Sequence, residues 1–250
     1  DSWQNASVEG IDIVIATDIS GSMLARDFEP NRLEASKEVA KEFISLRPND
    51  RIGLVVFSGE SFTQCPLTTD HSVLLNLFGG IKSGMVDDGT AIGLGLASAV
   101  SRLKDSEAKS KVIILLTDGV NNQGEVAPLT AAEIASTFDI RVYTIGVGTM
   151  GTAPYPVQTQ FGTRYQDVEV EIDEDVLQQI AQMTGGTYFR ATDNEKLKQV
   201  YEQIDELEKS KIEVTEFSKH KEEFLPIALG AAFLLLLEVG MRNTLLRTIP

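Results

Sequence analysis

Residues 11–23 read IDIVIATDISGSM, an apolar run that leads into a short segment of oxygen-bearing side chains. Uninterrupted runs rich in Val and Ile are typical of strands that are buried on both faces of a sheet. Three further runs of this kind lie at residues 52–57, 112–116 and 142–147. Together they predict a mainly parallel sheet.

Between and after these runs, apolar residues recur at helical spacing, in residues 33–44, 92–103 and 197–207. Alternating strands and helices predict a doubly wound α/β fold with right-handed crossovers and helices on both faces of the sheet. In such folds ligands bind outside the carboxyl ends of the strands. We therefore expect the functional residues directly after strands.

Two segments depart from simple alternation. Residues 60–65 form a short run after the second strand and predict an antiparallel edge strand. Residues 151–170 begin with Pro154 and Pro156 and place Phe161-Gly162 between polar alternating stretches, which predicts an inserted hairpin. An ordinary surface excursion and a binding role both remain open for that hairpin.

Composition limits the classes of function. The chain has 250 residues, 42% of them hydrophobic, which is enough for one domain with a substantial core and an appendage. Its formal net charge of -15 argues against a nucleic-acid surface, which needs clustered Lys and Arg. The lone Cys65 excludes an intrachain disulfide and a Cys-rich zinc site.

The C-terminal region changes character. Residues 224–237 are apolar and uncharged, the apolar stretch reaches Met241 if Glu238 is tolerated, and Arg242 and Arg247 follow. This is short for a membrane span, which takes about 20 residues, and a buried or re-entrant helix is the alternative. The run is apolar around its whole circumference, so we predict a transmembrane helix at residues 224–241 with the arginines on the cytoplasmic side.

Oxygen-bearing side chains follow the first strand at regular spacing. Asp18, Ser20 and Ser22 stand at positions i, i+2 and i+4, and Gly21 lets the chain turn tightly. Hard cations such as Mg²⁺ prefer oxygen ligands. An EF-hand loop is excluded, because the segment has one carboxylate and lacks the bidentate Glu.

Two more oxygen-bearing side chains follow later elements. Thr90 stands at the start of an apolar helix, where a simple helix cap is the common reading, and Asp118 follows the run at 112–116, where a turn residue is common. A parallel α/β sheet gathers such loops at one edge. The sequence therefore predicts one divalent-metal site built from Asp18, Ser20, Ser22, Thr90 and Asp118.

This pattern, Asp-x-Ser-x-Ser with a later Thr and a later Asp-Gly, resembles the metal-ion-dependent adhesion site (MIDAS) of von Willebrand factor A (VWA) domains. The resemblance implies that Ser20, Ser22 and Thr90 bind the metal directly, whereas Asp18 and Asp118 act partly through water. It also implies that a partner protein's Asp or Glu completes the coordination. Mg²⁺ suits such a site best, with Mn²⁺ or Ca²⁺ as substitutes.

Residues 12–28, 31–66, 88–122 and 141–148 look like the aerotolerance-operon (Bat) proteins of bacteria, BatA among them. That resemblance implies a domain held in the periplasm by the inner membrane, with other Bat proteins and a MoxR-type AAA+ ATPase as partners. We therefore expect a juxtamembrane segment at residues 1–10, the VWA domain at 11–210, a linker at 211–223, the transmembrane helix at 224–241 and a cytoplasmic tail at 242–250.

Three classes of function follow from these patterns. The leading hypothesis is a non-enzymatic, membrane-anchored subunit that binds an acidic side chain through its metal. A structural subunit whose metal only stabilises the fold is the main alternative. A metal-dependent phosphatase is disfavoured, because Ser20 replaces the second aspartate of an Asp-x-Asp loop and neither His71 nor His220 lies in a general-base motif.

Overall fold

The computed structural model describes residues 10–160, 162–219, 229–230 and 234–235. The chain divides into two units, Asp1–Ile204 and Asp205–Pro250. The first unit holds the sheet and the helices that cover it. Helix α6 (Asn194–Lys219) begins in the first unit, and its last part, from Asp205 on, belongs to the second unit.

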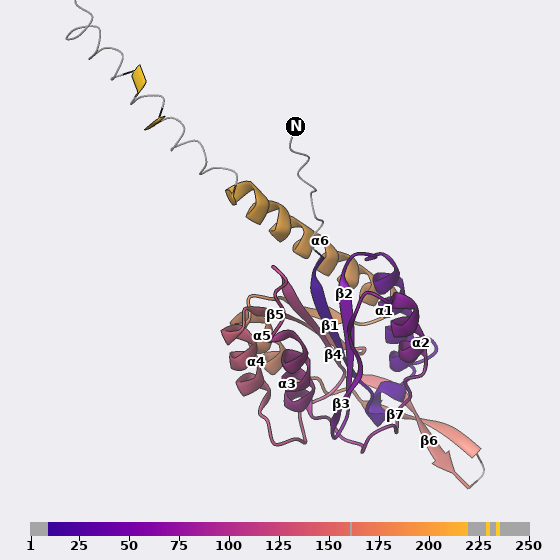
Figure 1. Ribbon diagram of the computed structural model, residues 1–250. Coiled ribbons are helices and arrows are strands. Elements are labelled where there is room, and N and C mark those ends of the chain that lie inside the picture. Colours follow the sequence, from indigo (N-terminus) through magenta and orange to yellow (C-terminus); the bar gives the residue numbers. More distant parts are fainter. Residues whose placement is uncertain (1–9, 161, 220–228, 231–233, 236–250) are drawn as a thin grey trace, which may run out of the picture. The chain divides into compact units, whose positions relative to one another are not determined.

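A six-stranded sheet forms the centre of the first unit, in the order β3-β2-β1-β4-β5-β8 (Figure 1). Neighbouring strands are parallel, except that β3 runs antiparallel to β2. The mainly parallel α/β sheet with one antiparallel edge strand is thus confirmed. The strands are β1 (Asp12–Asp18), β2 (Arg51–Phe57), β3 (Ser61–Thr68), β4 (Lys111–Thr117), β5 (Ile140–Val147) and β8 (Tyr188–Ala191).

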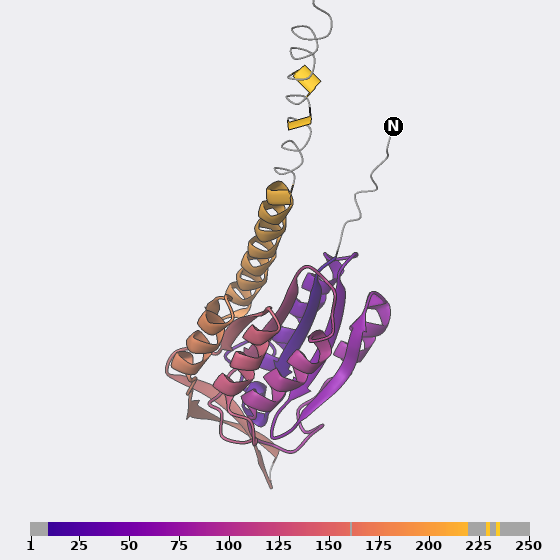
Figure 2. The ribbon, with the colours of Figure 1, turned by 60° about the vertical axis from the view of Figure 1, so that its left-hand side comes forward.

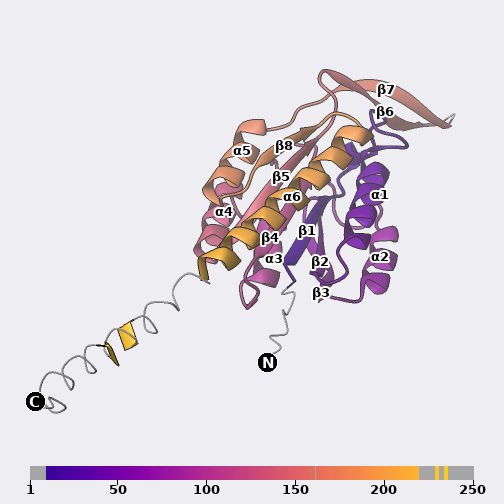
Figure 3. The same cartoon turned by 90° about the horizontal axis from the view of Figure 1, so that it is seen from above.

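Helices cover both faces of this sheet (Figures 1 and 3). One face carries α1 (Arg32–Ser45) and α2 (His71–Gly79), and the first part of α6 lies beside α1, where the rings of Phe43 and Tyr201 are 5.0 Å apart. The other face carries α3 (Ile92–Leu103), α4 (Pro128–Thr137) and α5 (Glu174–Met183).

The sheet is buried as its apolar runs predict. Every residue of β1 is buried, and so are all residues of β2 except Arg51. Val14, Val55 and Leu115 pack with Ile92 and Leu96 of α3 in one continuous core. Because both faces of β1 and β2 are covered, their charged side chains lie only at the strand ends, namely Asp12, Asp18 and Arg51.

A separate hairpin follows β5. Strands β6 (Thr152–Thr159) and β7 (Gly162–Glu169) pair antiparallel over their full length. They lie at the end of the sheet opposite the start of β1 (Figures 1 and 2). This hairpin occupies the segment where an insertion is expected, at the edge where the strands of the parallel sheet end.

Several elements were not predicted or run further than predicted. The helices α2, α4 and α5 and the short strand β8 were missed, and β3 extends to Thr68 rather than ending at Cys65. Helix α6 continues to Lys219, so residues 211–219 of the expected linker are helical. The expected cytoplasmic tail, the N-terminal segment up to residue 9 and most of the expected transmembrane helix at 224–241 lie outside the described residues.

In the part of the chain that the structure describes, none of the helices combines the length and the apolar character that a membrane span requires.

Candidate metal centre

Two aspartates lie side by side at the carboxyl edge of the sheet. Asp18 is the last residue of β1, Asp118 directly follows β4, and these strands are parallel neighbours, with Thr17 opposite Leu116. The strand order reverses at this pair, since β2 and β3 lie beyond β1 and β5 and β8 lie beyond β4. Loops diverge at such a point and leave a crevice, where ligands of open α/β sheets bind.

Asp18 is fully buried and held by neutral donors. Its Oδ1 accepts a hydrogen bond from the Ser20 N–H at 2.8 Å, and its Oδ2 accepts one from the Thr117 hydroxyl at 2.6 Å. These two contacts fix the orientation of the carboxylate. Neither of them brings a positive charge to it.

The two serines form a chain of contacts that reaches Asp118. The hydroxyls of Ser20 and Ser22 lie 2.9 Å apart, and Ser22 Oγ donates to Asp118 Oδ1 at 2.7 Å. Between them, the Gly21 N–H donates to Asp88 Oδ1 at 3.0 Å as the chain enters a single 3-10 turn, Gly21–Leu24. Alternate side chains of this loop therefore point to one place, as the i, i+2, i+4 spacing predicts.

Thr90 joins the same cluster from the segment before α3. The N-cap of α3 is Ala91, so Thr90 is not the helix cap that its position suggests. Its backbone is fixed by Asn122, because the Thr90 N–H donates to Asn122 Oδ1 at 2.9 Å and the Asn122 N–H donates to the Thr90 carbonyl at 3.0 Å. A Cβ placed on Gly119 would lie 3.3 Å from Thr90 Oγ1, so the hydroxyl lies against the backbone that follows Asp118.

Arg32 is a site residue that the sequence reading missed. Its Nη1 donates to Asp118 Oδ2 at 2.7 Å, while Nε and Nη2 donate to the two oxygens of Asp27 at 2.7 and 2.6 Å. Asn31 caps α1 by accepting the Glu34 N–H at 2.9 Å, which makes Arg32 the first helical residue. A cation in the first turn opposes the helix dipole, and that mismatch is the signal that points to Arg32.

The cluster holds more buried acidic side chains than basic ones. Burial, and then the charge of Asp118, raise the pKa of Asp18 to about 7. Burial also raises the pKa of Asp118, although Arg32 works against that rise. At Asp27, burial is outweighed by the Arg32 hydrogen bonds, which hold its pKa below the ordinary value. One arginine thus pairs with Asp27 and Asp118, while Asp18 has no such cationic contact among the described residues.

These residues fit a hard divalent cation. Two carboxylates and three hydroxyls meet, all of them oxygen donors, and a cation would relieve the repulsion between two buried acids. The described residues hold no cluster of three or more His, Cys, Asp or Glu side chains suited to a metal. The candidate site differs from such clusters because three of its five side chains are Ser or Thr.

The comparisons with known proteins agree with this architecture. The von Willebrand factor type A domain family matches residues 12–203. The chain belongs to this family. The matched region takes in all five predicted site residues.

Among solved structures, this VWA domain is similar to BatB from Bacteroides thetaiotaomicron, with 32% identity and a TM-score of 0.70 over 80% of this chain and 100% of that one. It is also similar to an aerotolerance-related membrane protein from Bacteroides fragilis, with 31% identity and a TM-score of 0.68 over 78% and 98% of the two chains. The protein is therefore a Bat-like VWA protein.

Curated relatives are longer than this chain. An uncharacterized protein of Borreliella burgdorferi is 38% identical over 187 residues, which cover 74% of this chain and 55% of the relative. A UPF0353 protein of Nocardia farcinica is 30% identical over 213 residues, 78% of this chain and 62% of the relative. The chain thus spans less than two thirds of the length of these relatives.

The β6–β7 hairpin of the VWA domain docks next to the predicted metal residues. The Arg26 N–H donates to the Pro154 carbonyl at 2.8 Å, and the Arg26 guanidinium lies 4.4 Å from the centre of the Tyr165 ring. A Cβ on Gly21 would lie 3.1 Å from Tyr155 Oη. The hairpin is therefore part of the wall around the candidate site.

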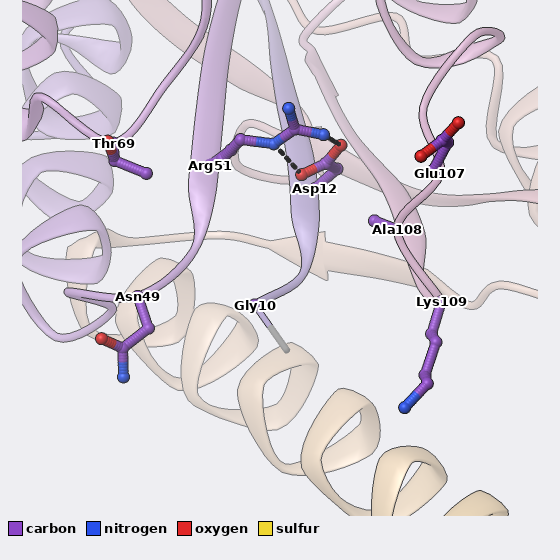
Figure 4. Close-up of a pocket in the computed structure, with 8 residues that line it drawn as sticks. All are labelled: Gly10, Asp12, Asn49, Arg51, Thr69, Glu107, Ala108 and Lys109. Carbon is purple, nitrogen blue, oxygen red and sulfur yellow. Dashed lines mark hydrogen bonds and ion pairs between the residues drawn. The ribbon is translucent and has the colours of Figure 1, made fainter. Parts of the chain in front are cut away.

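A cavity of about 400 Å³ lies at the opposite edge of the sheet, where the strands begin (Figure 4). Arg51 pairs there with Asp12, its Nε donating to Asp12 Oδ1 at 2.7 Å. Glu107 and Lys109 add one charge of each sign to the lining. Because the buried carboxylate of this cavity already has its own arginine, we do not assign a metal to it.

Proposed function

We propose that this VWA domain is a non-enzymatic adhesion module that binds partner proteins through a divalent cation. Ser20, Ser22 and Thr90 would be direct ligands, while Asp18 and Asp118 supply negative charge and orient the hydroxyls. The observation that carries the proposal is the convergence of two buried carboxylates and three hydroxyls at the strand-order reversal.

The cation would be Mg²⁺, with Mn²⁺ or Ca²⁺ as substitutes, because oxygen ligands of this kind suit hard cations. Neutral hydroxyl ligands leave the cation short of negative charge, so an Asp or Glu of a partner completes the shell favourably. A fold neighbour, proximal thread matrix protein 1 of the mussel byssus, is described with a zinc-occupied MIDAS motif. Its identity to this chain is 23% and the TM-score is 0.62, so it shares the fold, and its MIDAS motif is described as binding a divalent metal.

Arg32 supports a binding role over catalysis. It donates three hydrogen bonds of 2.6 to 2.7 Å to Asp118 and Asp27, and the one to Asp118 Oδ2 makes that carboxylate a poorer nucleophile. Asp18 is likewise held at both oxygens. These contacts support the proposal that both carboxylates orient ligands, and a phosphatase stays the disfavoured alternative.

The proposal extends to the membrane. Residues 224–241 would anchor the chain, with the VWA domain (residues 11–210) in the periplasm and residues 242–250 in the cytoplasm. The neighbour from Bacteroides fragilis is itself named a membrane protein. Partners would be acidic surfaces of other Bat or VWA membrane proteins, in a complex served by a MoxR-type ATPase.

Binding of a small carboxylate probe tests the site itself. We would follow acetyl-Gly-Asp-Gly-Gly-amide and its Asn analogue by NMR, with the full chain in saturating Mg²⁺ or in EDTA. The proposal predicts binding of the Asp peptide in Mg²⁺ alone, and none of the Asn peptide. Ser22→Ala should abolish this binding, whereas Ser45→Ala, a serine at the far end of α1, should leave it intact.

A purely structural metal gives a different pattern. Mg²⁺ should raise the melting temperature of the wild type in either case, because it binds the folded state. With a purely structural metal, however, the Asp peptide would bind equally with and without the ion. That result would contradict the adhesion proposal and favour the structural alternative.

A further inference from the structure

A small cavity begins at the proposed metal site. It measures about 240 Å³ and lies between the loop after β1 and the β6–β7 hairpin. Ser22 is one of its lining residues and also a proposed metal ligand, so any group bound to the metal would lie at the mouth of this cavity. Ligand pockets for whole small molecules run from about 300 Å³ upward, so this volume suits one side chain better.

The walls of the cavity are mainly apolar. Ala25 and Ala153 are buried, Val168 and Val170 come from the second strand of the hairpin and the residue after it, and Tyr155 also lines the cavity. Ala153 and Val168 are cross-strand partners, so they face the cavity from paired positions. An aliphatic side chain would lose water against all of these groups at once.

The charged groups at the cavity select against a second acidic side chain. Arg32 lines the cavity, but its three guanidinium nitrogens already donate to Asp27 and Asp118. Glu169 also lines it and would repel a carboxylate. Charge complementarity therefore directs a partner's acid to the cation and an uncharged neighbour into the cavity.

Exposed apolar side chains lie on the segments that surround the same edge. Met85 precedes Thr90 in one loop, Val120 follows Asp118 by two residues, and Val168 lies on the hairpin, and all three are exposed. Methionine and aliphatic residues left exposed around a polar centre are typical of protein-binding surfaces. They favour a protein partner over a free small carboxylate.

We propose that the hairpin cavity receives an aliphatic side chain next in sequence to the acidic residue that the metal binds. The partner motif is thus an Asp or Glu beside a Leu, Ile or Val. This inference rests on the proposed function, because the acidic residue is positioned by the cation. It assigns the β6–β7 hairpin the task of choosing among acidic partners.

Short peptides separate the two contributions. The probes are acetyl-Gly-Asp-Leu-Gly-amide and acetyl-Gly-Leu-Asp-Gly-amide, compared with acetyl-Gly-Asp-Gly-Gly-amide and acetyl-Gly-Asn-Leu-Gly-amide, on the full chain with saturating Mg²⁺. Burying one leucine side chain predicts that one of the first two binds about tenfold more tightly than the Asp-Gly peptide. Methyl signals of Val168 and Val170 should shift with that peptide.

Matched variants on one hairpin test the location. Val168→Asn should reduce the leucine advantage from about tenfold toward one, because a polar group then lines the cavity. Val157→Asn makes the same change on β6 at a residue that does not line the cavity, and should keep the advantage. Unchanged circular dichroism of both variants confirms that the comparison is between folded proteins.

The outcomes distinguish the two proposals. Equal affinity of the Asp-Leu, Leu-Asp and Asp-Gly peptides for the wild type overturns the cavity assignment and leaves the metal site standing. A leucine advantage that survives Val168→Asn overturns it as well. If the Asn peptide binds as tightly as its Asp counterpart, or if no acidic peptide binds, the proposed function itself is contradicted and the inference falls with it.

Discussion

Strand β1 begins and ends with a buried aspartate, and the two ends handle that charge in different ways. Asp12, at the start, accepts hydrogen bonds from Arg51 and from the Ser106 hydroxyl. Asp18, at the other end, accepts them from a backbone N–H and a threonine hydroxyl, and it faces Asp118. Asp12 is thus paired with a cationic side chain, whereas Asp18 has only neutral donors and an acidic neighbour.

The two ends of β1 therefore have different roles: the amino end contributes to stability, whereas the carboxyl end belongs to the proposed binding site. At the amino edge, Asp12 and Arg51 form an ordinary ion pair at the surface of the domain, where water reaches the half-exposed Arg51. The carboxyl edge keeps negative charge buried at the cost of folding free energy. Such local imbalance is common at functional sites, because the ligand supplies what the protein lacks.

The largest expected effect comes from removing the arginine of the carboxyl edge. Arg32→Met leaves Asp27 and Asp118 buried without their partner, so we expect the free energy of unfolding to fall by about 3–5 kcal/mol. Urea denaturation in EDTA measures this loss. Arg51→Met is the matched control at the amino edge, and it should cost less because its guanidinium is half exposed. A larger loss for Arg51→Met than for Arg32→Met would break the comparison.

The next effect depends on pH. The pKa of Asp18 in the folded protein is about 7, above its ordinary 3.8, so the folded state binds this proton more tightly than the unfolded state. This group therefore lowers stability as the pH rises from about 4 to about 7, and the loss is complete above pH 7. Relative to the wild type, Asp18→Asn should gain about 1–3 kcal/mol over that range in EDTA.

Denaturation of wild type and Asp18→Asn at about pH 5 and about pH 8 measures that gain. Mg²⁺ should cancel it, because the cation offsets the ionised carboxylate in the wild type alone. Asp12→Asn provides the contrast at the other end of β1, since it removes the partner of Arg51 and should lower stability at both pH values. A parallel response of the two Asn variants to pH would show that the ends of β1 do not differ.

The sequence predicts some of these features, whereas others become visible only in the folded structure. The central strands were predictable because their apolar runs are unbroken. The five candidate ligands could be proposed from the sequence because they lie at or just after the ends of strands or, for Thr90, just before a helix. Helix α4 was missed since its buried face consists of small Ala residues, and β8 because only four residues, Tyr188–Ala191, form it.

Long-range pairing accounts for the rest. Arg32 and Asp118 are 86 residues apart, and neither sequence segment contains a signal that predicts their contact. The contact of Arg26 with Pro154 and Tyr165 likewise joins the loop before α1 to a hairpin that lies far along the sequence. The five candidate ligands were thus accessible from pattern, whereas the residues that orient them and the wall beside them required the fold.

The smallest expected effect concerns orientation of the carboxylate. Thr117→Val removes the hydroxyl that donates to Asp18 Oδ2 at 2.6 Å and keeps the shape of the side chain. Loss of such a supporting contact should weaken Mg²⁺ binding by about tenfold, measured by isothermal titration calorimetry. Thr144→Val changes another fully buried threonine, on β5, whose hydroxyl donates to the Leu177 carbonyl. Equal Mg²⁺ affinity in the two variants would argue against a supporting role for Thr117.

The central claim is that the carboxyl edge of the sheet binds one divalent cation that the amino edge does not bind. Anomalous diffraction from crystals soaked in Mn²⁺ tests this claim most directly. The account predicts one strong peak among Ser20, Ser22 and Thr90, close to Asp18 and Asp118, and no peak beside Asp12. A peak beside Asp12, or a carboxyl edge without manganese at saturating concentration, would contradict it.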